Sequence, residues 1–325
     1  MKRTRKKAFT IVELLTVMGV IAVLIGLMVP ALALVKDYSK RIQQKAQFHG
    51  IDMGLQMYKT EMGSFPESSE NLYSPKAGDT SADAYCGANK LAEAMVGLDL
   101  IGYHPSSSFR GDGDSTVMLT TGVTGDVTVH NAEVDTPNWQ TVAENMDARK
   151  GPFVDLEKVN AFRMDEVYDA ANLGTFASST NVGAGTMYPL VLCDVYAQKR
   201  SGIGAKKTGT PILYFRAHTN YKFQDSMVNS DGVGGADDDD IYSYYDNEEL
   251  LLNGMPNDGT PFTVVTPIAP ATTAFEMFEK MIVNENVTTI QRPYRADSYI
   301  LVSAGKDGDF GTADDVFNFD KEITE

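Results

Sequence analysis

The sequence is poor in the side chains on which most enzymes and metal centres depend. Its 325 residues include two cysteines, four histidines and one tryptophan. The histidines stand apart from any serine, cysteine or second histidine at a catalytic or zinc-binding spacing, and no G-x-S-x-G or H-E-x-x-H motif occurs. We therefore expect a protein that is not an enzyme.

Basic residues are also scarce relative to acidic ones. There are 28 Lys and Arg against 44 Asp and Glu, for a net charge of −16. Such a surface repels phosphate backbones, so nucleic acid is a poor partner, whereas cation binding or simple solubility fits. The hydrophobic fraction of 43% is that of a globular protein with a sizeable core.

Charge is absent altogether from position 14 to position 35, a run of 22 apolar and small residues. At a rise of about 1.5 Å per residue, this run is long enough to cross a hydrocarbon core of about 30 Å as one helix. Five basic residues precede it within positions 2–7, which predicts a cytoplasmic N-terminus and an exported remainder.

Export leaves open whether Cys86 and Cys193 form a disulfide or remain buried thiols.

One acidic side chain, Glu13, lies at the edge of the uncharged run, with no Lys or Arg beside it on the helix. A charge at the rim of the hydrocarbon is costly and is retained when a partner neutralises it. The same helix turn offers no such partner, so the carboxylate needs an explanation.

The residues around Glu13 resemble the N-terminal segment of type IV pilins and type II secretion pseudopilins. A short basic leader ends at Ala8, in place of that family's usual glycine, and is followed by Phe9-Thr10-Ile11-Val12-Glu13-Leu14. The resemblance implies that a prepilin peptidase cuts between Ala8 and Phe9 and that the new Phe9 amine is methylated. It also implies that Glu13 pairs with the Phe9 amine of a neighbouring subunit.

The same resemblance implies a location and a set of partners. The chain would be a single-pass protein of the inner membrane, held in the lipid bilayer with its head in the periplasm or outside the cell. Sister pilin or pseudopilin subunits and an inner-membrane assembly platform would be its partners. Its function would be that of a structural subunit of a type IV pilus or a type II secretion pseudopilus.

Two other interpretations of the N-terminus remain open. A secretory signal peptide also has a basic start and an apolar core, and Ala31-Leu32-Ala33 would serve as its cleavage site. The product would be a soluble, Sec-exported and calcium-stabilised adhesin or hydrolase beginning near Leu34. The third interpretation is a membrane anchor that is never processed.

Downstream of the uncharged run, the pattern predicts an α+β fold in which a long N-terminal helix packs on a head with an antiparallel β-sheet. Apolar residues recur at three- and four-residue steps at Phe48, Ile51, Leu55, Tyr58 and Met62. We therefore expect three parts: a leader at 1–8, a stalk helix at 9–62 with its transmembrane segment at 14–35, and a globular head at 63–325. The stalk would be roughly 80 Å long.

Elements of the head are predicted from composition. Strands are expected at 189–196, 211–216 and 299–303, which are rich in β-branched and aromatic residues. The Gly- and Lys-rich turn between the first two predicts that they form an antiparallel pair. Short helices are expected at 89–100, 138–149 and 274–285, and residues 115–130 predict a hairpin or a mobile insertion.

Two acidic loops carry closely spaced aspartates and glycines, which together offer the hard oxygen ligands that Ca²⁺ prefers. The loop at 303–316 is similar to the calcium loop of type II secretion major pseudopilins. That similarity implies Asp307 and Asp315 as the principal ligands, with Asp309 and Asp314 in support and backbone carbonyls completing the shell. A solvated acidic turn is the alternative.

The second acidic loop, at 230–241, repeats the order of the first, with Asp-Gly, further glycines, Ala and a run of aspartates before an aliphatic residue. Its candidate ligands are Asp231, Asp237, Asp239 and Asp240. Adjacent aspartates repel one another, so a cation would stabilise the run. An exposed acidic loop without metal remains an equal alternative.

Overall fold

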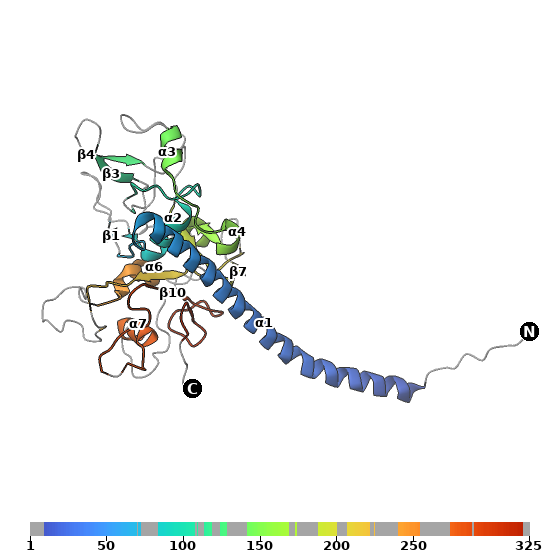
Figure 1. Ribbon diagram of the computed structural model, residues 1–325. Helices are drawn as coiled ribbons and strands as arrows, with labels where there is room; N and C mark the ends of the chain where they lie inside the picture. The colour runs from blue at the N-terminus through green and yellow to red at the C-terminus, as the bar shows by residue number, and fades with distance from the viewer. Residues whose placement is uncertain are drawn as a thin grey trace, which may run out of the picture. The chain divides into compact units, whose positions relative to one another are not determined.

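The computed structural model in Figure 1 describes residues 10–69, 71–72, 84–107, 109, 114–118, 124–128, 142–168, 173, 188–199, 207–221, 224, 240–253, 274–287 and 289–320. Its contacts divide the chain into two compact units, Met1–Gln43 and Gln44–Glu325. The second is called the globular unit below. As predicted, the secondary structure is α+β, with a long apolar N-terminal helix followed by small antiparallel sheets.

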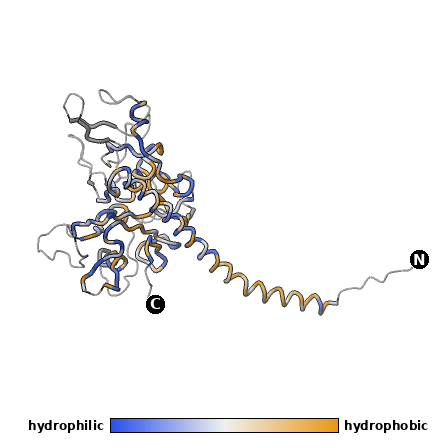
Figure 2. Tube along the Cα trace, viewed as in Figure 1, coloured by the Kyte–Doolittle hydropathy of each residue, from blue (hydrophilic) through white to orange (hydrophobic). Residues whose placement is uncertain are grey.

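Helix α1 runs from Ile11 to Met62 without interruption, including through Pro30. Its C-terminal end is the one predicted, and Gly63 follows with φ of +85°, a left-handed conformation that glycine adopts without strain. Figure 2 shows the N-terminal part of α1 as almost continuously hydrophobic. Among the described residues, α1 alone is long and apolar enough to cross a membrane, and none of its apolar window is buried.

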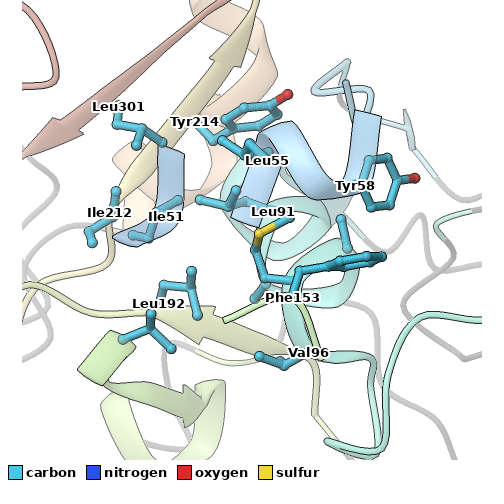
Figure 3. Packing of buried hydrophobic residues seen from close by; sticks show 14 of the residues in the cluster. Ile51, Leu55, Tyr58, Leu91, Val96, Phe153, Leu192, Ile212, Tyr214 and Leu301 are labelled. Atoms are coloured by element: carbon cyan, nitrogen blue, oxygen red, sulfur yellow. The ribbon is translucent and has the colours of Figure 1, made fainter. Parts of the chain in front are cut away.

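The second part of α1 belongs to the globular unit and buries one face there. Phe48, Ile51, Leu55 and Tyr58 lie in a hydrophobic cluster with α2 (Gly87–Val96), as Figure 3 shows for Ile51, Leu55 and Tyr58 beside Leu91. Two buried glutamines add polar contacts. Gln47 Nε2 donates to the carbonyls of Val159 at 3.0 Å and Cys193 at 2.8 Å, and Gln44 Oε1 accepts from the Val195 amide at 2.9 Å.

The principal sheet is antiparallel, in the order β11 (Val316–Phe317), β10 (Tyr299–Ser303) and β9 (Leu213–Arg216). Successive side chains of β10 point to opposite faces. Leu301 lies in the cluster with α1 and α2, whereas Ile300 lies in a second cluster with residues of α6 (Glu248–Asn253) and α7 (Ala274–Ile282). Because both faces of the sheet are buried, the sequences of these strands are continuous apolar runs.

The predicted antiparallel pairing of residues 189–196 with 211–216 is present as one bridge, in which the Ile212 N–H donates to the Leu192 carbonyl at 2.7 Å and the Asp194 N–H donates to the Thr210 carbonyl at 2.9 Å, but it does not form a ladder. Strand β6 (Leu190–Leu192) pairs instead with β5 (Ala161–Arg163), and β9 pairs with β10. The two segments meet only at an isolated bridge between Cys193 and Pro211. The connection between them forms its own small hairpin, β7 (Gln198–Lys199) with β8 (Lys207–Thr208), so it does not act as a simple turn.

Several shorter elements match their predictions. The hairpin predicted within 115–130 is present as β3 (Asp114–Met118) paired with β4 (Thr124–Thr128), beginning one residue earlier than predicted. Helix α2 ends at Val96, earlier than predicted, because Gly97 follows with φ of +76°. The remaining described elements are β1 (Asn71–Leu72), β2 (Ala84–Tyr85), α3 (Val142–Ala148), α4 (Leu156–Val159), α5 (Met164–Val167) and the 3₁₀ helix η1 (Tyr244–Asn247).

The structure also shows whether the two cysteines form a disulfide. Cys86 and Cys193 are both buried in the second cluster, and they are thiols rather than a disulfide. Cys86 precedes the first residue of α2 and Cys193 follows β6. Of the two alternatives left open by the sequence, the structure therefore has the buried thiols.

Substituting alanine for two glycines on α1 should change the free energy of unfolding in opposite directions. A Cβ on Gly54 would lie 2.5 Å from Val154 Cγ1 and 3.1 Å from the Phe153 carbonyl oxygen, whereas one on Gly50 would meet nothing within 4 Å. Gly54→Ala should therefore lower the free energy of unfolding by about 1–3 kcal/mol through overpacking. Gly50→Ala should raise it by about 0.5–1 kcal/mol through helix propensity. Denaturant unfolding of the full chain in micelles measures both, and equal effects would contradict this packing.

Candidate assembly and cation sites

The N-terminus of α1 is capped by reciprocal hydrogen bonds between Thr10 and Glu13. Glu13 Oε2 accepts hydrogen bonds from the Thr10 backbone N–H and from Thr10 Oγ1, each at 2.9 Å. In return, Thr10 Oγ1 accepts from the Glu13 backbone N–H at 3.3 Å. This T-x-x-E arrangement is a capping box, which satisfies two of the N–H groups that a helix start leaves without intrahelical partners.

The capping box gives Glu13 two hydrogen-bond donors on its own helix turn, which were not predicted from the sequence. Both donors come from Thr10, three residues earlier, and both are neutral. Among the described residues, Glu13 therefore has two hydrogen-bond donors but no ion pair. A carboxylate held at a helix start also interacts favourably with the positive end of the helix dipole.

The two residues of the predicted processing site, Ala8 and Phe9, lie outside the described residues. So does most of the second acidic loop, including Asp231, Asp237 and Asp239. Asp240 is described, and it is buried.

In the C-terminal acidic loop, Asp314 organises the backbone. Its Oδ2 accepts from the backbone N–H groups of Lys306 at 2.6 Å and Asp307 at 3.1 Å, and its Oδ1 accepts from Thr312 Oγ1 at 2.6 Å. Burial opposes ionisation of Asp314, but hydrogen bonds from Thr312 and the loop backbone bring its pKa below the usual value. Gly305, at φ of +68°, makes room for Asp314, because a Cβ there would lie 2.4 Å from the Asp314 backbone carbonyl oxygen and 2.7 Å from its Oδ2.

Asp307 lies beside Asp314, and Asp309 follows in the same turn. Burial raises the pKa of Asp307, and its contact with the Asp314 carboxylate raises it further. Asp307 Oδ1 accepts from the Asp309 backbone N–H at 2.9 Å. The structure thus brings Asp307 and Asp314 together, whereas Asp309 enters this network through its backbone.

Asp315 is the most buried carboxylate of the loop, with 4% of its surface exposed. Its Oδ2 accepts from the Gly311 N–H at 2.8 Å. Its Oδ1 is buried and has no hydrogen-bond partner within the described chain. Burial raises the pKa of Asp315 well above its usual range, although the Gly311 hydrogen bond acts in the opposite direction.

These features partly fit a hard cation. The loop offers a buried carboxylate oxygen without a partner and two further carboxylates in contact, which is the oxygen chemistry that Ca²⁺ uses. Within the part of the chain that the structure describes, however, no three His, Cys, Asp or Glu side chains lie together in a way that would hold a metal ion. Ca²⁺ takes six to eight oxygens, so loop carbonyls and water would have to supply most of the shell.

Comparison with known proteins adds no relative. No family model, no curated protein and no solved structure matches this chain. The chemistry of the two sites and the architecture of the chain are therefore the basis for a functional proposal.

Sequence reasoning missed the role of Thr10. The signal was present, since a Thr followed three residues later by Glu at the start of an apolar run is the pattern of a capping box. It also missed a buried cluster around Asp246, whose parts come from segments far apart in the sequence and carry no local motif.

Proposed function

We propose that this protein is a pilin-like structural subunit, inserted in the inner membrane, trimmed between Ala8 and Phe9, and assembled into a pilus or secretion pseudopilus. The observation that carries the proposal is the two-part character of α1. One helix is exposed and uncharged at positions 14–35 and then, from Gln44 onward, buries a single face in a globular unit. A helix with every backbone bond internal is suited to lipid, and equally to packing against copies of itself.

Glu13 supplies the second part of the proposal. Its carboxylate is bound by two neutral donors of Thr10, so the net negative charge remains. A charge at the edge of an apolar segment is most favourable when an opposite charge reaches it. Cleavage after Ala8 would create such a charge, the new amine of Phe9, and a neighbouring subunit would deliver it to Glu13 during assembly.

The acidic character of the chain beyond the leader suits an exported protein with a cation-stabilised loop. Removing a leader with five basic residues leaves 23 basic against 44 acidic residues, a net charge of −21. We propose that the loop at 303–316 takes Ca²⁺, with Asp315 and Asp307 as ligands and Asp314 holding the loop backbone in place. The cation would offset repulsion among these carboxylates.

A processing assay tests the proposal. Co-expression of the full chain with a prepilin peptidase should convert it to a form that lacks eight residues, as measured by intact mass. Because the resembled family usually has glycine before the cut, Ala8→Gly should be processed at least as fast as the wild type.

The matched control is Ala33→Gln, which removes the small residue of the alternative secretory site and should leave processing unchanged. Cleavage that depends on Ala33 and not on Ala8 would favour the secretory signal peptide. A full-length product in the presence of an active peptidase would favour an unprocessed anchor.

A further inference from the structure

Asp246 is a carboxylate buried in the globular unit, with 3% of its surface exposed. It lies in η1, directly before α6, and it accepts a hydrogen bond from Ser68 Oγ. Ser68 Oγ in turn accepts from the Arg216 backbone N–H at 2.8 Å. With a single hydroxyl proton, Ser68 connects η1 to the end of strand β9 through the carboxylate of Asp246.

The neighbouring Asn247 repeats this attachment with uncharged groups. Its Oδ1 accepts from the Ala88 N–H of α2 at 2.9 Å, and its Nδ2 donates to the Tyr214 carbonyl of β9 at 2.9 Å. Tyr214 Oη donates to the Pro66 carbonyl at 2.7 Å. Hydrogen bonds of Asp246 and Asn247 therefore attach the segment at 244–253 to three other parts of the globular unit, and Asp246 contributes the carboxylate at this buried point.

Titratable groups on each packed element lie in the surroundings of Asp246. Glu67, in the segment after α1, has a side chain that is 41% exposed. Lys90, on α2, has a side chain that is fully buried. Lys90 Nζ binds Glu67 Oε1 at 2.8 Å and the Ser69 carbonyl at 2.6 Å, so it is already engaged by other oxygens. From β9 comes Tyr214, which stays neutral because burial raises its pKa well above the usual value.

We propose that Asp246 is a pH-sensitive latch that holds η1 and α6 on the core when protonated and loosens them when ionised. Its own surroundings favour the neutral form, since it is buried and Lys90 is bound to Glu67 and to the Ser69 carbonyl. Burial raises the pKa of Asp246 to about 7, although the Ser68 hydrogen bond and Lys90 lower it. The inference does not depend on the proposed function.

The sign of the effect follows from linkage. A carboxyl whose pKa is higher in the closed state than in the open state stabilises the closed state fully below its ordinary pKa near 3.9. That contribution is lost as the pH rises towards 7. Opening of the segment at 244–253 should therefore increase by roughly ten- to 100-fold between pH 5 and pH 8.

Hydrogen exchange on the full chain in detergent micelles tests this inference. After correction for intrinsic exchange, protection of residues 244–253 and of the Ala88 and Arg216 amides should fall between pH 5 and pH 8 in the wild type. In Asp246→Asn the fall should disappear, because the amide still accepts from Ser68 but does not titrate. Asp297→Asn, at a side chain that is 86% exposed, is the matched control and should retain it.

Two results would overturn the inference. One is an equal pH dependence in the wild type and in Asp246→Asn. The other comes from the wild type alone, so it does not rely on folding of the variant. Infrared difference spectra between pH 5 and pH 8 should show a buried carboxyl C=O band lost with a midpoint near neutrality, and its absence would rule out the latch.

Discussion

Glu13→Ala is expected to insert into the membrane normally but to enter filaments at least about tenfold less than the wild type. Insertion depends on the uncharged run and the basic leader, and the substitution leaves both intact. Assembly would lose the negative charge that pairs with the Phe9 amine of the next subunit. Leaving a charge without its partner in an apolar interface costs about 3–5 kcal/mol, and about 1.4 kcal/mol already corresponds to a factor of ten. Fractionation measures insertion, and sheared filament yield measures assembly.

The capping box makes a sharper comparison possible at the same position. Glu13→Gln removes the charge but keeps an oxygen that accepts from the Thr10 N–H, because Gln serves in a capping box as Glu does. Thr10→Ala removes the hydroxyl partner but keeps the charge. Charge pairing predicts that Glu13→Gln assembles as poorly as Glu13→Ala while Thr10→Ala assembles better than either. The reverse order would mean that Glu13 serves to start the helix and that intersubunit pairing is wrong.

Removal of Ca²⁺ is expected to lower the unfolding temperature of the wild-type globular unit, and Asp315→Asn is expected to abolish that response. A ligand at 100 times its dissociation constant stabilises the folded state by about 2.7 kcal/mol. At about 2–4 °C per kcal/mol for a domain of 150–250 residues, the shift should be on the order of 5–10 °C. Thermal unfolding of the full chain in micelles, with Ca²⁺ and with a chelator, measures it.

The metal-free forms provide an independent check on the same loop. Asp315 Oδ1 is buried without a partner in the described chain, so the metal-free wild type bears the cost of that carboxylate. Asp315→Asn removes the charge and should be at least as stable as the wild type in chelator while failing to respond to Ca²⁺. Asp297→Asn, outside the loop, should respond fully. A wild type that unfolds at one temperature with and without chelator would remove the calcium site.

The sequence was most informative where structure is determined locally. The end of α1 at Met62 follows from side-chain periodicity and the glycine beyond it, both of which lie within a few residues. The pairing of β9 with β10 could not be predicted in the same way. Residues 211–216 and 299–303 are both apolar runs that suit several partners, and the choice depends on covering both faces of the sheet at once.

The same distinction applies to the sites. Thr10 and Glu13 are three residues apart, and their contact could have been predicted from a recognised pattern. Asp307, Asp314 and Asp315 were predicted as a group, but which of them organises the loop depends on backbone N–H directions that no spacing reveals. Asp246 and Ser68 come from segments far apart in the chain, and neither residue is unusual in its own segment.

Identification of the first residue of the mature protein tests the proposed function most directly. Mass spectrometry of the N-terminal peptide, from protein purified out of its native envelope, identifies that residue and any methyl group on its amine. Pilin-like processing predicts N-methylated Phe9. A chain that begins at Met1 or near Leu34 would contradict it.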